Sequence, residues 1–233
     1  MTRPGWLSAL CVAAALSAMT TGCTNIVDGT AVRASSSIPA DDVPPLDEYA
    51  LDGLMLSNSA LAEIAGVDLE SLYDSEETND NADMVTDIDC LGAIYPGEDV
   101  VYDGSDYSAI RDELLLEAVA DDNGKLIEQT LVLFDTPDDA AEFFETSKAT
   151  WRECAQIKDI EVEDGAWVPA AVEDVDERTI SLKADVSGTL EGTCQHAMGV
   201  VSNLIVEGFS CDVDDHDDAQ RITSQLLEDA SEQ

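Results

Sequence analysis

Two cysteines and a histidine near the C-terminal end have types and a spacing that could bind a metal ion. Cys194 and His196 are two positions apart, Cys211 closes the segment CQHAMGVVSNLIVEGFSC, and a second histidine, His216, follows in an acidic tract. A structural zinc site takes four ligands, and no second Cys/His pair here has the usual spacing. The alternative is a disulfide between Cys194 and Cys211, which an oxidising compartment permits. The sequence favours the disulfide, and we expect no metal and no cofactor.

The N-terminus has the features of a secretory signal. Arg3 precedes an apolar run over residues 7–19, which is too short to cross a bilayer as a helix, and small residues then lead to Cys23. A small residue directly before a cysteine at this point resembles the cleavage site of bacterial lipoproteins, in which the cysteine receives lipid. An ordinary cleaved signal with a fortuitous cysteine is the alternative. We expect residues 1–22 to be removed, Cys23 to be lipidated, and residues 23–45 to form a flexible tether to the cell membrane.

If Cys23 carries lipid, four cysteines of the exported chain remain for disulfides: Cys90, Cys154, Cys194 and Cys211. Positions 194 and 211 are symmetric about the dipeptide 202–203. A hairpin that turns there sets these two cysteines directly opposite each other, as a non-hydrogen-bonded pair whose side chains lie close together. The sequence therefore predicts the pair Cys194–Cys211, which leaves Cys90 to pair with Cys154.

The charge of the chain is strongly negative and limits its partners. The sequence has 51 acidic and 10 basic residues, a formal net charge of −41, and removal of Arg3 with the signal brings the mature value to 9 − 51 = −42. Such a surface excludes nucleic acid as a partner, and it does not bind an anionic membrane through its own charge. Any membrane attachment is expected to come from the lipid. The acidity itself is explained by solubility or a salty habitat, with a cationic partner as the alternative.

The motifs of common catalytic and calcium sites are missing from the sequence. No Gly-x-Ser-x-Gly occurs, and the chain has only two histidines to serve as general bases. The acidic stretch 74–83 lacks the central glycine and the closing glutamate of a calcium loop, so we expect an acidic surface loop there. Asp212, Asp214 and Asp217 also lack a loop pattern that would make them calcium ligands. We expect no catalytic residues.

Helices and strands can be located from the pattern of apolar residues. A short helix is expected from Ser57 to Gly66, a strand over 126–134, and then a helix with Thr136 as its N-cap. Further strands are expected at 167–172, 179–186 and in the two arms of the hairpin, followed by a final helix over 217–227. The expected buried face of the helix after Thr136 consists of Ala140, Phe144, Ser147, Trp151 and Cys154. These elements indicate an α+β fold, a mostly antiparallel sheet with helices packed on one face and two disulfides.

Four stretches of the chain carry a resemblance to a known family. They are LDGLMLSNSALAEIAG (51–66), DIDCLGAIYPGEDVVYDGSDYSAIRDE (87–113), LVLFDTPDDAAEFFETSKATWRECA (131–155) and GTCQHAMGVVSNLIVEGFSCD (192–212). In this order they resemble the PknH-type extracellular sensor domain, found outside a mycobacterial serine/threonine kinase and in actinobacterial lipoproteins. The resemblance covers roughly residues 45–230, and we take residues 46–233 as this domain. It implies the same two disulfides, and a cleft between sheet and helices for a small ligand whose identity is unknown.

The resemblance also marks His196 as the candidate ligand residue, because the family commonly carries arginine at this position. A histidine there would contact an anionic ligand only when it is protonated. No glycine-rich loop with its partner lysine and no transmembrane helix is expected, so the chain is not expected to phosphorylate a target. We expect a non-enzymatic lipoprotein of the cell envelope that senses or binds a small ligand. A protein-interaction module and an enzyme of envelope metabolism are the alternatives.

Overall fold

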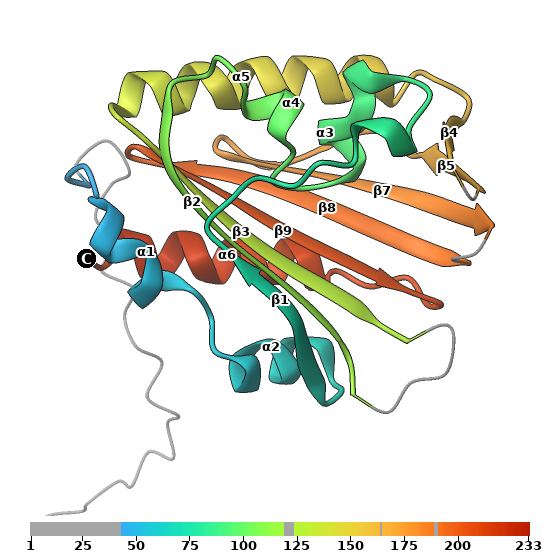
Figure 1. Ribbon diagram of the computed structural model, residues 1–233, viewed down its shortest axis with the longest axis horizontal. Coiled ribbons are helices and arrows are strands. Elements are labelled where there is room, and N and C mark those ends of the chain that lie inside the picture. Colours follow the sequence, from blue (N-terminus) through green and yellow to red (C-terminus); the bar gives the residue numbers. More distant parts are fainter. Residues whose placement is uncertain (1–42, 119–123, 164, 189–190) are drawn as a thin grey trace, which may run out of the picture. The chain divides into compact units, whose positions relative to one another are not determined.

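A nine-stranded antiparallel sheet organises the part of the chain that the structure describes (Figure 1). This structure, a computed structural model, describes residues 43–118, 124–163, 165–188 and 191–233, so the expected signal, Cys23 and most of the tether lie outside the described residues. The strand order is β1-β2-β3-β9-β8-β7-β5-β4, with β6 paired to β7. The strands are β1 (Leu69–Ser75), β2 (Tyr107–Glu117), β3 (Leu126–Phe134), β4 (Ile160–Val162), β5 (Gly165–Pro169), β6 (Glu173–Asp176), β7 (Thr179–Gly188), β8 (Gly192–Val201) and β9 (Leu204–Asp212).

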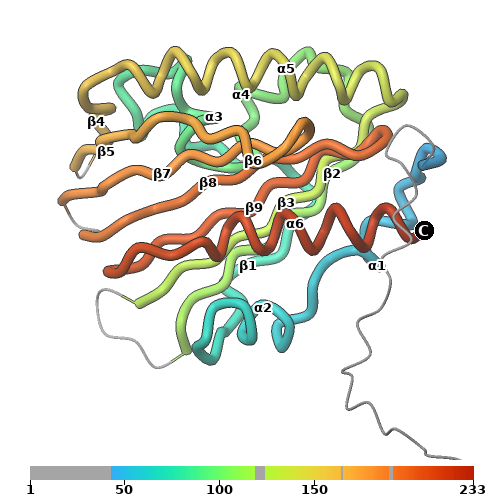
Figure 2. The backbone as a smooth tube through the Cα atoms, turned by 180° about the vertical axis from the view of Figure 1, so that it is seen from behind, coloured from blue at the N-terminus to red at the C-terminus, as the bar shows by residue number. Residues whose placement is uncertain are grey.

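Helices cover both faces of this sheet. The α-helices are α1 (Glu48–Leu54), α2 (Asn58–Ala65), α3 (Leu91–Ile94), α4 (Asp99–Tyr102), α5 (Pro137–Cys154) and α6 (Asp218–Ser231), and the 3-10 helices are Ala82–Met84 and Ile88–Cys90. One core cluster joins α3, α4 and α5 to the sheet, and a second joins α1, α2 and α6 to it. Figure 2, seen from behind, shows α6 lying across strands of the sheet, and its core cluster is separate from that of α5.

The central strands explain why both faces are covered. In β3, Val132 and Phe134 belong to the α5 core, whereas Ile127, Leu131 and Leu133 belong to the α6 core. Because side chains alternate between the faces of a strand, a strand that is apolar at nearly every position needs a layer on each side. The expected α+β class, antiparallel sheet and two disulfides are confirmed. The structure differs from the sequence analysis in having helices on two faces where one was expected.

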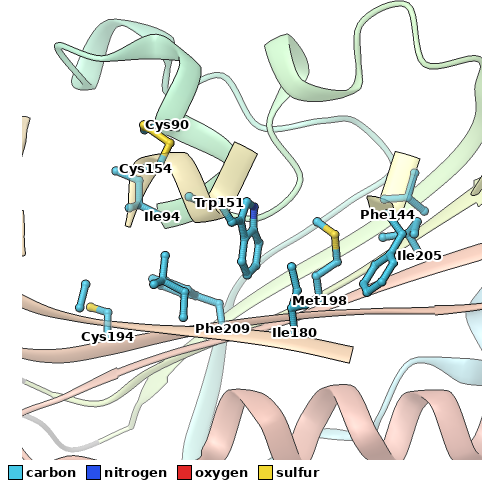
Figure 3. Packing of buried hydrophobic residues seen from close by; sticks show 14 of the residues in the cluster. Cys90, Ile94, Phe144, Trp151, Cys154, Ile180, Cys194, Met198, Ile205 and Phe209 are labelled. Carbon is cyan, nitrogen blue, oxygen red and sulfur yellow. A yellow bond between two sulfur atoms is a disulfide. The ribbon is translucent and has the colours of Figure 1, made fainter. Parts of the chain in front are cut away.

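Helix α5 forms as its sequence predicts. The Thr136 hydroxyl accepts a hydrogen bond from the Asp139 amide, and Pro137 occupies the first turn. Its buried residues are the five that were expected: Ala140, Phe144, Ser147, Trp151 and Cys154. Figure 3 shows Phe144 and Trp151 extending from α5 toward Ile180, Met198 and Ile205 of the sheet.

The β8–β9 hairpin has the expected register. Val201 faces Leu204 next to the turn, and Cys194 faces Cys211 farther along. These two cysteines form one disulfide, and Cys90 and Cys154 form the other. Ser202 adopts a left-handed conformation in the turn, with φ 51°.

Other boundaries match in part. Helix α2 begins after Ser57, whose side chain accepts a hydrogen bond from the Ala60 amide, and it ends at Gly66 with φ 74°. The last helix runs on to Ser231, beyond the expected residue 227. The stretch 74–83 is less of a surface loop than expected, because its first two residues end β1 and Asn79 reaches a buried carboxyl pair.

Candidate functional site

A groove runs between α5 and the segment that carries α3 and α4. Its volume is about 670 Å³. One wall is a face of α5, and the other is formed by residues 88–92, by α4 and by the loop that follows α4. The lining residues are Ile88, Asp89, Gly92, Val100, Val101, Asp103, Gly104, Ser105, Asp106, Asp139, Glu142, Phe143, Thr146, Ser147, Thr150, Trp151 and Glu153.

The helix wall follows from the periodicity of α5. Positions 139, 142, 143, 146, 147, 150 and 151 are three or four residues apart, so they lie along one side of the helix. Ser147 and Trp151 belong both to this side and to the buried face. With a rise of about 1.5 Å per residue, the lined stretch of α5 is about 20 Å long.

The Cys90–Cys154 disulfide fastens the two walls to each other. Cys90 ends the 3-10 helix Ile88–Cys90, and Cys154 is the last residue of α5. Farther along, the ring of Tyr102 stacks on that of Phe143, with centroids 4.6 Å apart. The disulfide and the aromatic contact therefore help to hold the second wall against α5, together with the shared core.

His196 lies in the layer beneath this groove. Its side chain is about 1% exposed, and its ring centroid is 4.4 Å from that of Trp151. His196 Nε2 is 2.7 Å from Glu207 Oε2, and His196 Nδ1 is 3.4 Å from the carbonyl oxygen of Ala93. His196 does not line the groove, whereas its ring neighbour Trp151 does.

Glu207 connects the sheet to the second wall of the groove. Besides the contact to His196, its Oε1 accepts hydrogen bonds from the Tyr102 hydroxyl, at 2.5 Å, and from the Gly97 amide, at 3.2 Å. Gly97 has φ 66°, and a Cβ there would lie 3.3 Å from atoms of Asn79 and Thr130. A glycine therefore suits this close approach of the wall to the sheet. Burial raises the pKa of Tyr102, and the Glu207 charge raises it further, so the phenol remains protonated as a donor.

A second group of buried acids continues from Glu207 toward β2. Asp112 accepts hydrogen bonds from the Thr130 hydroxyl and from Asn79 Nδ2. Glu128 Oε1 accepts from Asn79 Nδ2 at 3.1 Å and from the Tyr73 hydroxyl at 3.0 Å. Burial raises the pKa of Asp112 to about 6. Burial, and next the charge of Asp112, raise the pKa of Glu128 well above its ordinary value of 4.5. The raised pKa values therefore favour retention of a proton on this pair to higher pH than on ordinary carboxyl groups.

Glu98 is the remaining acid of this layer. It is 1% exposed, and its carboxylate accepts hydrogen bonds from the backbone amide and the side-chain amide of Asn81. Burial raises its pKa, and the two bonds from Asn81 oppose the shift. The buried acids as a group join the loop 76–98 to the sheet.

The sequence analysis did not identify Tyr73, Asn79, Asp112 or Glu128. One signal was available, because Glu128, Gln129 and Thr130 interrupt the otherwise apolar strand LIEQTLVLF. A carboxyl in the middle of a buried strand needs partners, and this predicts a polar network there. The identity of the partners could not be read from the sequence, since Tyr73 and Asn79 precede β2 by a long stretch of chain.

The sequence analysis also considered a metal site, a transmembrane helix and a role for His216, and the described part of the chain bears on each. No group of three or more metal-binding side chains gathers there. None of its helices is long and apolar enough to cross a membrane. His216 lies 3.1 Å from Asp212, and Asp212 also pairs with Lys125.

Known proteins are similar to this chain in sequence and in fold. A sequence model of the PknH-like extracellular domain matches residues 46–228. Serine/threonine-protein kinase PknH of Mycobacterium bovis is 28% identical over 195 residues, which are 82% of this chain and 32% of the kinase. PknH of Mycobacterium tuberculosis is also 28% identical, over 82% of this chain and 31% of the kinase. The chain thus spans about a third of the length of the curated relatives it matches.

A solved structure matches over a similar extent. The crystal structure of the extracellular domain of PknH from Mycobacterium tuberculosis superimposes with a TM-score of 0.76 at 26% sequence identity. The match covers 82% of this chain and all of that one. The similarity is to the extracellular domain of a kinase and not to its catalytic domain.

Proposed function

This chain belongs to the family of PknH-like extracellular domains, and on that premise we propose that it is an extracytoplasmic sensor domain that binds a small ligand in the groove along α5. The proposed activity is binding without chemical conversion of the ligand.

The groove itself is the observation that supports this proposal. Its volume of about 670 Å³ falls in the range of about 300–1,000 Å³ that is typical of small-molecule sites. Ile88 and Val100 are 43% and 44% exposed and stand on the wall opposite α5. Exposed apolar side chains beside polar ones are a common lining for a ligand site. The other large exposed apolar residues lie on separate elements, for example Leu72 on β1 and Val168 on β5.

Binding is favoured over catalysis by the position of the perturbed acids. Asp112 and Glu128 have raised pKa values, as an acid catalyst would, but their oxygens are engaged by Thr130, Asn79 and Tyr73. Neither carboxyl lines the groove. A general acid must reach the reacting atom within hydrogen-bond distance. Asp112 and Glu128 are therefore better suited to a structural role, in which they hold the loop 76–98 on the sheet, than to catalysis.

We also propose that lipid on Cys23 holds the protein at the outer side of the cell membrane. The support is the signal-like N-terminus and the extracellular position named for the matching PknH domain. Replacing Cys23 with alanine should release the protein from the membrane fraction. Cys11→Ala, within the segment expected to be removed, is the matched control and should leave attachment unchanged. Tight attachment of the Cys23→Ala protein would overturn the lipid proposal.

Groove binding can be tested with a blocking variant. Thr146 is exposed and lines the groove, so Thr146→Trp fills the space without touching the core. Ala149 is exposed on the same helix and does not line the groove, so Ala149→Trp is the control. The mature chain is incubated with a small-molecule extract of its host's envelope and weighed by native mass spectrometry. We expect an adduct on the unmodified chain and on Ala149→Trp that is lost from Thr146→Trp. No adduct, or one that Thr146→Trp retains, would contradict the proposal.

A further inference from the structure

We propose that the ligand of this groove is an elongated organic polycation, a linear polyamine with protonated amino groups separated by short apolar spacers. This inference rests on the proposed function and names the ligand's chemical class. Both walls of the groove carry carboxylates, and none of its lining residues is a lysine, an arginine or a histidine. The acids are Asp89, Asp103, Asp106, Asp139, Glu142 and Glu153.

The charges of α5 are divided between two sides of the helix. Its Lys148 and Arg152 both pair with Asp174 of β6, at 2.9 and 2.6 Å. These two cations are one turn apart, and neither lines the groove. The groove side of α5 keeps Asp139, Glu142 and Glu153. The acidity of the groove is therefore not offset by the cations of its own helix.

The hydroxyl of Ser147 gives a second, independent indication. Ser147 is 8% exposed and lines the groove, and none of the hydrogen bonds between described residues involves its hydroxyl. The hydroxyl opens onto the groove, so a molecule bound there can be its hydrogen-bond partner. An ammonium group carries only donors, and both the Ser147 oxygen and the surrounding carboxylates can accept from it.

The shape of the groove selects an extended molecule. Its lined stretch along α5 is about 20 Å long, and its acids are distributed along both walls. The lining also includes the half-buried side chains of Val101 and Phe143 and the buried Trp151. Amino groups separated by short methylene chains can meet the carboxylates while the methylenes cover this apolar strip. An anion of the same length would be repelled along its whole length.

Spermine is the probe for the test, with tetraethylene glycol as an uncharged molecule of similar length. Binding to the mature chain is measured by isothermal titration calorimetry at neutral pH and about 150 mM NaCl, which screens weak long-range attraction. The groove variant combines Asp103→Asn, Asp106→Asn and Glu142→Gln. The control combines Glu70→Gln, Glu177→Gln and Glu228→Gln, which are exposed positions outside the groove. Both variants change the net charge equally.

We expect one spermine per chain and no binding of the glycol. The groove variant should lose about tenfold or more in affinity, because three ion pairs are removed, while the control should change by about twofold at most. Ser147→Ala should weaken spermine by a smaller factor. Equal losses in the two charge variants, or no saturable binding, would overturn the polycation class. If the envelope adduct blocked by Thr146→Trp is neutral or anionic, groove binding stands and the polycation class falls. If the unmodified chain shows neither an envelope adduct nor saturable spermine binding, both proposals are refuted.

Discussion

Replacing Glu128 with glutamine should stabilise the fold, and the gain should grow with pH. Glutamine keeps an oxygen that can accept from Tyr73 and Asn79, as Glu128 Oε1 does. Its amide can donate to Asp112, as protonated Glu128 does, so the variant reproduces the protonated network. The variant differs from the wild-type chain because the glutamine side chain does not ionise, whereas the Glu128 carboxyl can lose its proton.

The sign and size of the effect follow from the raised pKa of Glu128. Above pH 4.5, its ordinary value, Glu128 is ionised in the unfolded chain and still protonated in the folded one. The unfolded state then releases a proton that the folded state keeps, so wild-type stability falls by about 1.4 kcal/mol per pH unit until the folded pKa is reached. The variant lacks this loss. Its advantage should be near zero at pH 4 and should grow by about 1.4 kcal/mol per pH unit above pH 4.5 until the folded pKa of Glu128 is reached.

Urea unfolding of both proteins at pH 4, 5, 6 and 7 measures this difference. The midpoint of unfolding of Glu128→Gln should rise relative to the wild type as pH increases. Glu70→Gln, an exposed change on β1, should show no such trend. A gain independent of pH, or a destabilisation at every pH, would refute a protonated Glu128 in the folded state.

Three further changes test other contacts. Lys125 Nζ lies 2.7 Å from the carboxylate of Asp218, so Lys125→Met should lower the free energy of unfolding by about 3–5 kcal/mol, measured with urea. His196→Leu should lower the free energy of unfolding by about 1–3 kcal/mol, because it leaves Glu207 Oε2 without its hydrogen-bond partner, and adding Glu207→Leu should recover part of the loss. A double variant as unstable as the two single losses summed would deny the pairing. Cys90→Ser with Cys154→Ser should lower it by about 4 kcal/mol and weaken spermine binding, whereas unchanged affinity would show that the disulfide does not shape the groove.

Much of the fold could be predicted because it depends on local signals. Thr136, Pro137 and the apolar spacing of α5 specify that helix, and the symmetry of the chain about residues 202–203 specifies the hairpin. Strands β1 and β2 were not predicted, because β1 lies at the edge of the sheet and is largely exposed. Charged residues such as Arg111 in β2 obscure the alternation that identifies a strand. The second helical layer was missed because apolar positions show that a strand is buried without showing what covers each face.

The candidate site was harder to predict than the fold. The position of His196 was noted, but its partner Glu207 stands in the opposite strand and Tyr102 lies far away in the sequence. The groove depends on how α4 is placed against α5, and no local pattern fixes that placement. Only the disulfide end of the groove could be predicted from the sequence, because Cys154 at the end of α5 needed a partner elsewhere in the chain.

The buried acids also bear on how the strands choose their alignment. A sheet that is apolar on both faces tolerates an error of one residue in pairing, because apolar side chains exchange for apolar side chains. In β3 such a slip would turn Glu128 and Thr130 toward Ile222 and Leu226 of α6, away from Asn79 and Asp112. Each polar group stranded there costs about 1–3 kcal/mol. The few buried acids in this apolar sheet thus specify the register of the strands, because only one alignment leaves their polar groups hydrogen-bonded.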